Sequence, residues 1–233
     1  MKNISFVYLD SDKVVETTRK LVLRIEERFP NSGLLKIASE LVTLGEDIEE
    51  TCVRLQKPIL WIRFVSILTI LALIGVIYFL LQYVFKNLHN QATIFEMIQG
   101  LDAAVNEIIL FVLAVYFIIN GEKMWKRNIV LKKLHLLRSL IHVVDMHQLT
   151  KDPTVLRGNH QATKSSPFRT MSNFELMRYL DYCSEILSIS GKYAALFAQD
   201  TQDGIILQAV NDIENSAQNL SQKIWQKIMV IGI

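Results

Sequence analysis

Residues 64–85 read FVSILTILALIGVIYFLLQYVF and contain no Asp, Glu, Lys, Arg or His. About 20 predominantly apolar residues are enough for a helix to cross a bilayer. Arg63 and Lys86 flank this run, and Trp61 lies just before it, as is typical of a span anchored at the membrane interfaces. The stretch therefore predicts a transmembrane helix over about 61–85. The alternative is the buried core helix of a soluble protein.

A second apolar segment reads LDAAVNEIILFVLAVYFIIN at 101–120. Its strictly uncharged part, 108–121, is too short to cross a bilayer by itself. A span here must therefore include Asp102 and Glu107 near one of its ends. We expect this second span over about 101–121.

The charges around the two segments predict the topology. From Glu122 to Lys151 there are seven Lys or Arg and two Asp or Glu, whereas residues 86–100 contain Lys86 as their single Lys or Arg. Cytoplasmic loops carry the excess of Lys and Arg. The pattern predicts an outside loop at about 86–100 and both termini in the cytoplasm.

Apolar residues recur with helical periodicity through most of the remaining chain, and no segment alternates like a strand. Ser172-Asn173-Phe174-Glu175 has the Ser-x-x-Glu form of a capping box, which marks the start of a helix. The helices expected outside the two spans cover 10–28, 34–56, 172–190 and 205–228, and the second span is expected to continue through 122–148 as one long or mildly kinked helix.

These elements predict an all-α integral membrane protein with two transmembrane helices and a cytoplasmic helical bundle built from both the N- and C-terminal segments. Each soluble segment leaves an apolar helix face to cover, so we expect the two segments to pack together. The expected parts are a cytoplasmic helical hairpin at 1–58, a transmembrane region at 59–121, and a cytoplasmic helical domain at 122–233 with a loop at about 152–171.

Several functional classes find no support in the sequence. The net charge is only +2, so no global basic field indicates sequence-specific nucleic-acid binding. Cys52 and Cys183 are isolated and have no zinc-site spacing, which favours reduced core thiols. The chain has no phosphate-binding loop, dinucleotide glycine pattern, nucleophile elbow or HExxH motif. We therefore expect no enzyme activity, catalytic residue, cofactor or metal.

The second span carries a candidate pore face. At about 100° per residue, six of its residues lie within about 80° of one another and form a polar entrance, an apolar stretch and a polar exit. Two spans cannot enclose a water path alone, so a pore requires a homo-oligomer. The alternative is that Asp102 and Glu107 lie among the lipid headgroups and only end the span. The predicted pore-lining residues are Asp102, Asn106, Leu110, Leu113, Phe117 and Asn120.

Two further clusters follow the second span. The first is basic, and such residues either contact lipid headgroups or hold an anionic ligand such as a nucleotide; they are Lys126, Arg127, Lys132, Lys133 and Arg138. The second is a polar stripe on the same helix, which forms either a seam between helices or subunits, or a weak metal or proton site at the last two members; its residues are His135, His142 and Asp145.

The order of these parts, together with the pore-like face, resembles the two-span membrane effectors of bacterial antiphage systems, Hailong-type effectors among them. The resemblance covers most of the chain at the level of layout. It implies a homo-oligomeric channel in the bacterial inner membrane that is gated by its cytoplasmic domain and depolarises the membrane. The implied partners are the lipid bilayer, further copies of the chain, and a nucleotide or oligonucleotide ligand or a regulatory protein. The alternative function is a membrane-anchored scaffold that recruits a cytoplasmic partner.

Overall fold

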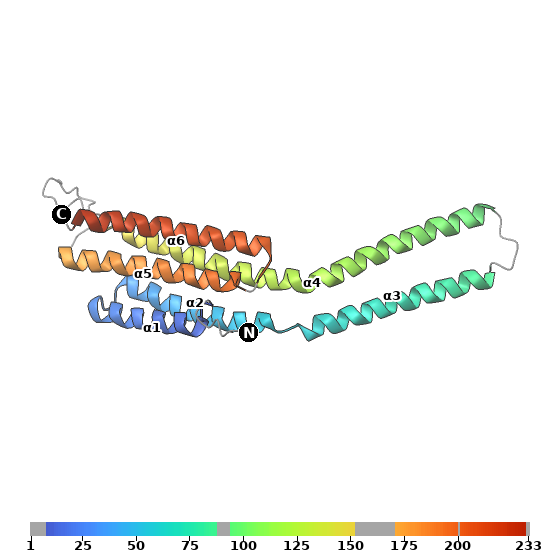
Figure 1. Cartoon of the computed structure of the whole chain (residues 1–233), viewed down its shortest axis with the longest axis horizontal. Coiled ribbons are helices and arrows are strands. Elements are labelled where there is room, and N and C mark those ends of the chain that lie inside the picture. Colours follow the sequence, from blue (N-terminus) through green and yellow to red (C-terminus); the bar gives the residue numbers. More distant parts are fainter. Residues whose placement is uncertain (1–7, 88–93, 152–170, 200, 232–233) are drawn as a thin grey trace. The chain divides into compact units, whose positions relative to one another are not determined.

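The computed structural model describes residues 8–87, 94–151, 171–199 and 201–231, and every regular element in these ranges is an α-helix. The predicted all-α class is therefore confirmed for the described part of the chain. The predicted loop at about 152–171 lies almost entirely outside the described residues. The helices are α1 Ser11–Arg28, α2 Gly33–Gln56, α3 Leu60–Asn87, α4 Ile94–Leu149, α5 Asn173–Ala198 and α6 Gly204–Ile231 (Figure 1).

Local signals set the helix ends. Asp10 caps α1 by accepting the N–H of Asp12 at 3.1 Å. The turn into α2 places Asn31 at φ 60°, in the left-handed region that asparagine tolerates better than most residues. At the start of α5, Ser172 and Glu175 form the predicted capping box, with side chain and backbone bonded in both directions.

The chain divides into two compact units. The first joins Met1–Leu55 to Ile129–Ile233, so α1, α2, α5, α6 and the end of α4 belong to one bundle. All of the buried hydrophobic residues among the described ones lie in this unit. Its core includes fully buried side chains from each of the five helices, among them Leu21, Leu41, Leu137, Leu187 and Ile224.

The second unit, Gln56–Asn128, contains α3 and the first part of α4. In Figure 1, α4 runs back in the direction opposite to α3. α4 begins at Ile94, so the last residues of the predicted 86–100 loop are helical. By length and composition, one described helix, Ile98–Leu149, could cross a membrane, and the apolar stretch Arg63–Phe79 is shorter than that test requires.

Apolar side chains surround the helices of the second unit, yet none of its described residues is buried. On α3, Phe64, Leu71 and Phe79 are 61%, 60% and 71% exposed. Soluble monomers rarely leave contiguous apolar surface of this extent uncovered. Among the described residues, nothing buries this apolar surface.

Candidate functional site

The predicted pore face lies open on the first part of α4. Leu110, Leu113 and Phe117 are 65%, 48% and 65% exposed, and Asp102 and Asn106 are exposed as well. None of these five side chains is buried by α3 or by any other described residue. The face is thus free to meet water, lipid or another copy of the chain.

Asn120, at the other end of that face, is half-buried, and its side-chain amide donates to the carbonyl of Tyr116 at 2.8 Å. This bond uses only part of the amide, which can donate twice and accept through its oxygen. Asn120 therefore keeps hydrogen-bonding capacity on the predicted pore face. Glu107 is also half-buried, and it forms no ion pair with the described residues of the unit.

A polar clamp, which sequence reasoning did not predict, joins α3 to α4. Glu122 accepts from Arg63 Nε at 3.2 Å, from Lys126 Nζ at 3.0 Å and from the backbone N–H of Ile59 at 3.3 Å. Lys126 also donates to the carbonyl of Lys57 at 3.1 Å. We call Arg63, Glu122 and Lys126 the Glu122 clamp. The sequence shows Arg63 before the charge-free run and Glu122 after the second predicted span, but no spacing rule pairs these two residues.

Two tryptophans lie near the clamp in sequence, and both are exposed. Trp61 is 73% exposed and its ring stacks on Phe64 with 6.5 Å between centroids, while Trp125 is 47% exposed. Tryptophan beside Lys and Arg is the composition of a membrane–water interface. The clamp and the two rings lie at the start of α3 and at the end of the apolar part of α4, which the predicted topology places on the same side.

Three residues of the predicted basic cluster form ion pairs with carboxylates of the chain. Lys133 pairs with Asp47 of α2, Arg138 pairs with Asp212 of α6 at 3.4 Å, and Lys126 belongs to the Glu122 clamp. Lys132 is exposed and Arg127 is half-buried. Lys133 and Arg138 therefore link helices of the first unit. The sequence had suggested lipid headgroups or an anionic ligand as partners of these residues, and not carboxylates of the same chain.

The predicted polar seam is not one cluster. His142 is exposed, and Asp145 accepts from Gln148 Nε2 at 2.6 Å. Gln148 in turn accepts from Lys227 of α6 at 2.5 Å, so Asp145 contributes to a contact between α4 and α6. His135 lines a different feature, a groove.

This groove lies between α4 and α6, has a volume of about 260 Å³ and has a mainly apolar lining. His135 and the Arg138–Asp212 ion pair contribute its polar groups. Its volume lies just below the range of about 300–1,000 Å³ that is usual for small-molecule sites. Its other lining residues are Leu131, Leu134, Ile205, Gln208, Ala209 and Ile213.

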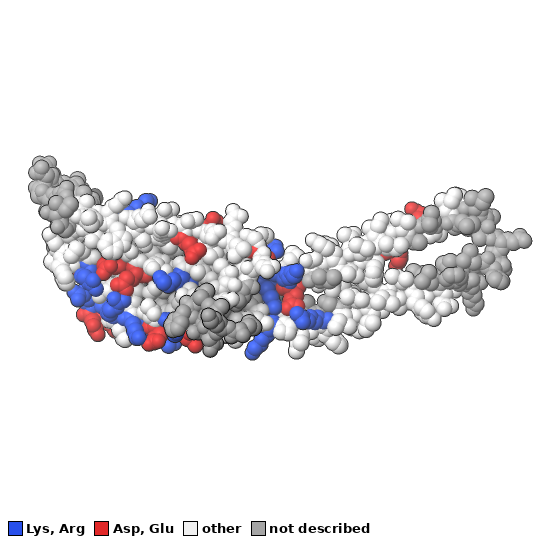
Figure 2. All heavy atoms as spheres, viewed as in Figure 1, with Lys and Arg blue, Asp and Glu red and all other residues white. Residues whose placement is uncertain are grey.

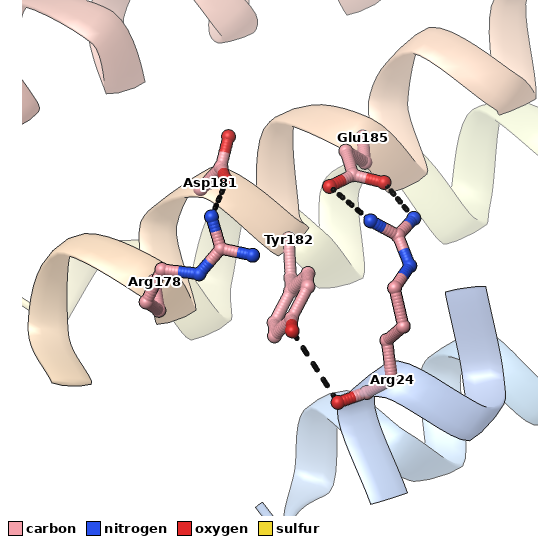
Figure 3. A network of polar contacts seen from close by, with 5 residues as sticks. All are labelled: Arg24, Arg178, Asp181, Tyr182 and Glu185. Atoms are coloured by element: carbon pink, nitrogen blue, oxygen red, sulfur yellow. Dashed lines mark hydrogen bonds and ion pairs between the residues drawn. The ribbon is translucent and has the colours of Figure 1, made fainter. Parts of the chain in front are cut away.

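A network on Tyr182 fastens α1 to α5 (Figure 3). The Tyr182 hydroxyl donates to the carbonyl of Arg24 at 3.3 Å, and Arg24 makes a two-bond ion pair with Glu185. The guanidinium of Arg178 lies 5.1 Å from the Tyr182 ring centroid and donates to Asp181 at 2.7 Å. The N-terminal hairpin is thereby joined to the C-terminal part of the chain.

Burial raises the pKa of titratable groups in the first unit. Burial raises the pKa of the Cys183 thiol to about 12, so it stays protonated and poorly nucleophilic at neutral pH. Burial also raises the pKa of Tyr193, whose hydroxyl forms a 2.8 Å hydrogen bond with Thr18. In the part of the chain that the structure describes, no three His, Cys, Asp or Glu side chains come together as metal ligands.

Comparisons with protein-family models, with curated proteins and with solved structures find no match to this chain.

Proposed function

We propose that this chain is a homo-oligomeric membrane channel whose second unit forms the pore and whose first unit is a cytoplasmic gate. The observation that carries the proposal is the second unit, which exposes large apolar side chains along α3 and the first part of α4 and has no buried residue among those described. Lipid and neighbouring copies together would cover this surface. Lipid covers an apolar side chain, and a neighbouring copy covers a polar one such as Asp102.

In this proposal α3 and the apolar part of α4 are the two predicted spans, at about 61–85 and 101–121. α3 has 28 residues, which is more than the about 20 that a bilayer requires. The Glu122 clamp supports a hairpin, because it holds the first residues of α3 beside the end of the second span. The basic excess after Glu122 puts this end in the cytoplasm, and the membrane is the bacterial inner membrane.

The pore is lined by the exposed face of α4. Copies arranged around an axis would bring Asp102 into a ring at the mouth and Leu113 and Phe117 into a hydrophobic constriction. Such constrictions close channels by expelling water, and acidic rings favour cations. Opening would depolarise the membrane, as expected of an effector in bacterial antiphage defence.

The route from gate to pore is α4 itself. α4 contributes its first part to the second unit and its last part to the first unit. A nucleotide, oligonucleotide or regulatory protein that changed the packing of the first unit would therefore act on the helix that carries the constriction. The ion pair between Arg138 and Asp212 is half-exposed and weak, so an anionic ligand can displace the Asp212 carboxylate from Arg138.

The test is ion flux from liposomes containing the purified protein, together with its oligomeric mass in detergent. Phe117→Ser and Asp102→Asn should change flux or its ion preference. Ile108→Ser is the matched control, because Ile108 is 61% exposed and lies on another side of α4. Equal effects of Phe117→Ser and Ile108→Ser would contradict the pore face.

The second candidate is a membrane-anchored scaffold, and the apolar groove between α4 and α6 is the observation that favours it. In this case Asp102 lies among headgroups, Asp102→Asn changes nothing, and the protein conducts no ions. A cytoplasmic partner retained by wild type and lost in Leu131→Glu would support the scaffold.

A further inference from the structure

One face of α3 joins a cation to a row of apolar side chains. At about 100° per residue, its four members lie within about 80° of one another, and all four side chains are exposed. The rise from the first member to the last is about 16.5 Å, which is close to half of the hydrocarbon core of a bilayer, about 30 Å thick. We call these residues the Arg63 face: Arg63, Ile67, Leu71 and Ile74.

The Glu122 clamp orients the guanidinium at the head of this face. Arg63 donates to Glu122 through Nε at 3.2 Å, and the Arg63 side chain is 59% exposed whereas that of Glu122 is 16% exposed. The two Nη groups of Arg63 form no hydrogen bond with any residue that the structure describes. Because a guanidinium is a planar fork of N–H donors, those on the Nη groups remain available to a ligand.

The end of the second unit around the clamp carries a surplus of positive charge. Residues 56–63 and 121–128 contain five Lys or Arg against one Asp or Glu, a net charge of +4. The single acid is Glu122, and both Lys57 and Lys123 are exposed. In Figure 2, Lys and Arg side chains surround acidic ones at this end, and the adjoining surface of the unit is mostly uncharged. This end therefore attracts anionic groups.

We propose that the Arg63 face binds an anionic phospholipid. The phosphodiester group accepts from the Nη groups of Arg63, and an acyl chain lies along the apolar row below it. The planar fork of arginine matches two phosphate oxygens at once. The proposal rests on the membrane position of α3 in the proposed function, and it adds the class of lipid and the residue that holds its headgroup.

Charge and apolar surface together select this class of ligand. A free phosphate or a nucleotide would use the fork and leave the apolar row uncovered. A zwitterionic phospholipid would cover the row, but the five cations at this end would repel its ammonium group. Each basic residue near an anionic leaflet favours binding roughly fivefold. An anionic phospholipid satisfies both parts of the face.

Quenching of tryptophan fluorescence by brominated lipid tests the site in the full chain, reconstituted in liposomes. The chain has three tryptophans, and Trp225→Phe leaves the two near the clamp in sequence, Trp61 and Trp125. Replacing phosphatidylcholine stepwise by brominated phosphatidylglycerol, and in a parallel series by brominated phosphatidylcholine, gives the relative binding constant of the two lipids. We expect phosphatidylglycerol to bind several-fold more tightly. Equal binding of the two lipids would overturn the proposal.

Two variants separate the fork from the general charge of this end. Arg63→Gln removes the fork and should bring the two binding constants close to equal. Lys123→Gln is the matched control, because it removes the same charge from the same end of the unit without touching the Arg63 face. It should keep most of the preference for phosphatidylglycerol. Equal losses in the two variants would show that no particular residue holds the headgroup, against the proposal.

Arg63→Lys separates loss of the fork from loss of the clamp. This variant keeps a positive charge beside Glu122 but has no planar fork, so it should recover only part of the preference that Arg63→Gln loses. A preference equal to that of the wild type would mean that charge alone selects the lipid, and it would refute the role of the fork.

Ion flux from the same liposomes separates this site from the channel. A preference for phosphatidylglycerol in a protein that conducts no ions supports the lipid site and contradicts the proposed channel. Flux without that preference overturns the lipid site and leaves the proposed channel standing.

Discussion

At the scale of single residues, close contacts decide which substitutions the bundle tolerates. A Cβ atom at Gly45 would come within 2.1 Å of the Tyr193 hydroxyl oxygen and within 2.3 Å of its Cζ atom. Tyr193 is fully buried and bonded to Thr18, so its ring cannot move aside. Gly45 therefore serves as the point where α2 approaches α5 closely.

We expect Gly45→Ala to destabilise the protein by about 1–3 kcal/mol, the usual cost of overpacking a core. Gly191→Ala is the control, since nothing lies within 4 Å of its Cβ position in α5. Alanine should stabilise that helix by roughly 0.5–1 kcal/mol. Thermal melting followed by circular dichroism in detergent measures both. Equal shifts of the two melting temperatures would contradict the close approach.

At the scale of elements, α1 and α5 begin at local caps, and polar contacts between residues distant in sequence link helices to one another. The capping box of α5 is local: the Ser172 N–H donates to the Glu175 carboxylate at 2.7 Å. The Glu122 clamp is not local, because Arg63 and Glu122 come from different helices. The first kind of contact is readable from sequence spacing, and the second is not.

The capping box should make the stability of the protein depend on pH. The backbone N–H of Ser172 holds the pKa of Glu175 below its ordinary value. A depressed folded-state pKa contributes stability that is present above the unfolded pKa and is lost as the pH falls through the folded one. Glu175→Gln, which removes the titrating carboxylate, should therefore lower the melting temperature at pH 7 and have a smaller effect in acid, where Glu175 is itself neutral. An effect that grows in acid would contradict this assignment.

The Glu122 clamp predicts a charge-reversal rescue. Arg63→Glu places two carboxylates together where the first residues of α3 contact Glu122 of α4, so the melting temperature in detergent should fall. Adding Glu122→Arg restores opposite charges and should recover part of the loss, although Lys126 then repels the new arginine. If the double variant melted no higher than Arg63→Glu alone, the two side chains would not interact.

At the scale of the whole molecule, residues from both ends of the chain form one unit. Met1–Leu55 folds with Ile129–Ile233. The Gln199 amide, at the end of α5, bonds both backbone groups of Leu9, at 2.6 and 3.1 Å. Arg24 and Tyr182 add the network of Figure 3. The proposed gate is thus assembled only when both segments are present.

Arg24→Ala should loosen this assembly. The residue makes a partly exposed ion pair to Glu185 and lies 5.8 Å from the Tyr182 ring centroid. Together these contacts are worth about 1 kcal/mol, which corresponds to roughly 2–4 °C in melting temperature for a chain of this size. Lys36→Ala, at an exposed cation of α2, is the control and should change little. Equal shifts of the two melting temperatures would indicate that Arg24 does not link α1 to α5.

The sequence by itself determined the elements. Apolar periodicity and the Ser172–Glu175 pair locate helices, because caps and helix faces depend on residues only a few positions apart. The charge-free run at 64–85 is equally local. These features predicted the all-α class and the pore face of α4 as a row of spaced residues.

Only the tertiary structure decided which side chains meet. Asp47 with Lys133, Asp212 with Arg138 and Glu122 with Arg63 are far apart in the chain, and no spacing rule links them. The packing also gives His135 and Asp145, which helical periodicity placed on one stripe, different neighbours: His135 lines the groove with Asp212, whereas Asp145 accepts from Gln148, which accepts from Lys227. Helix periodicity orders the residues of one helix, whereas the partner of each face depends on the packing of the whole bundle.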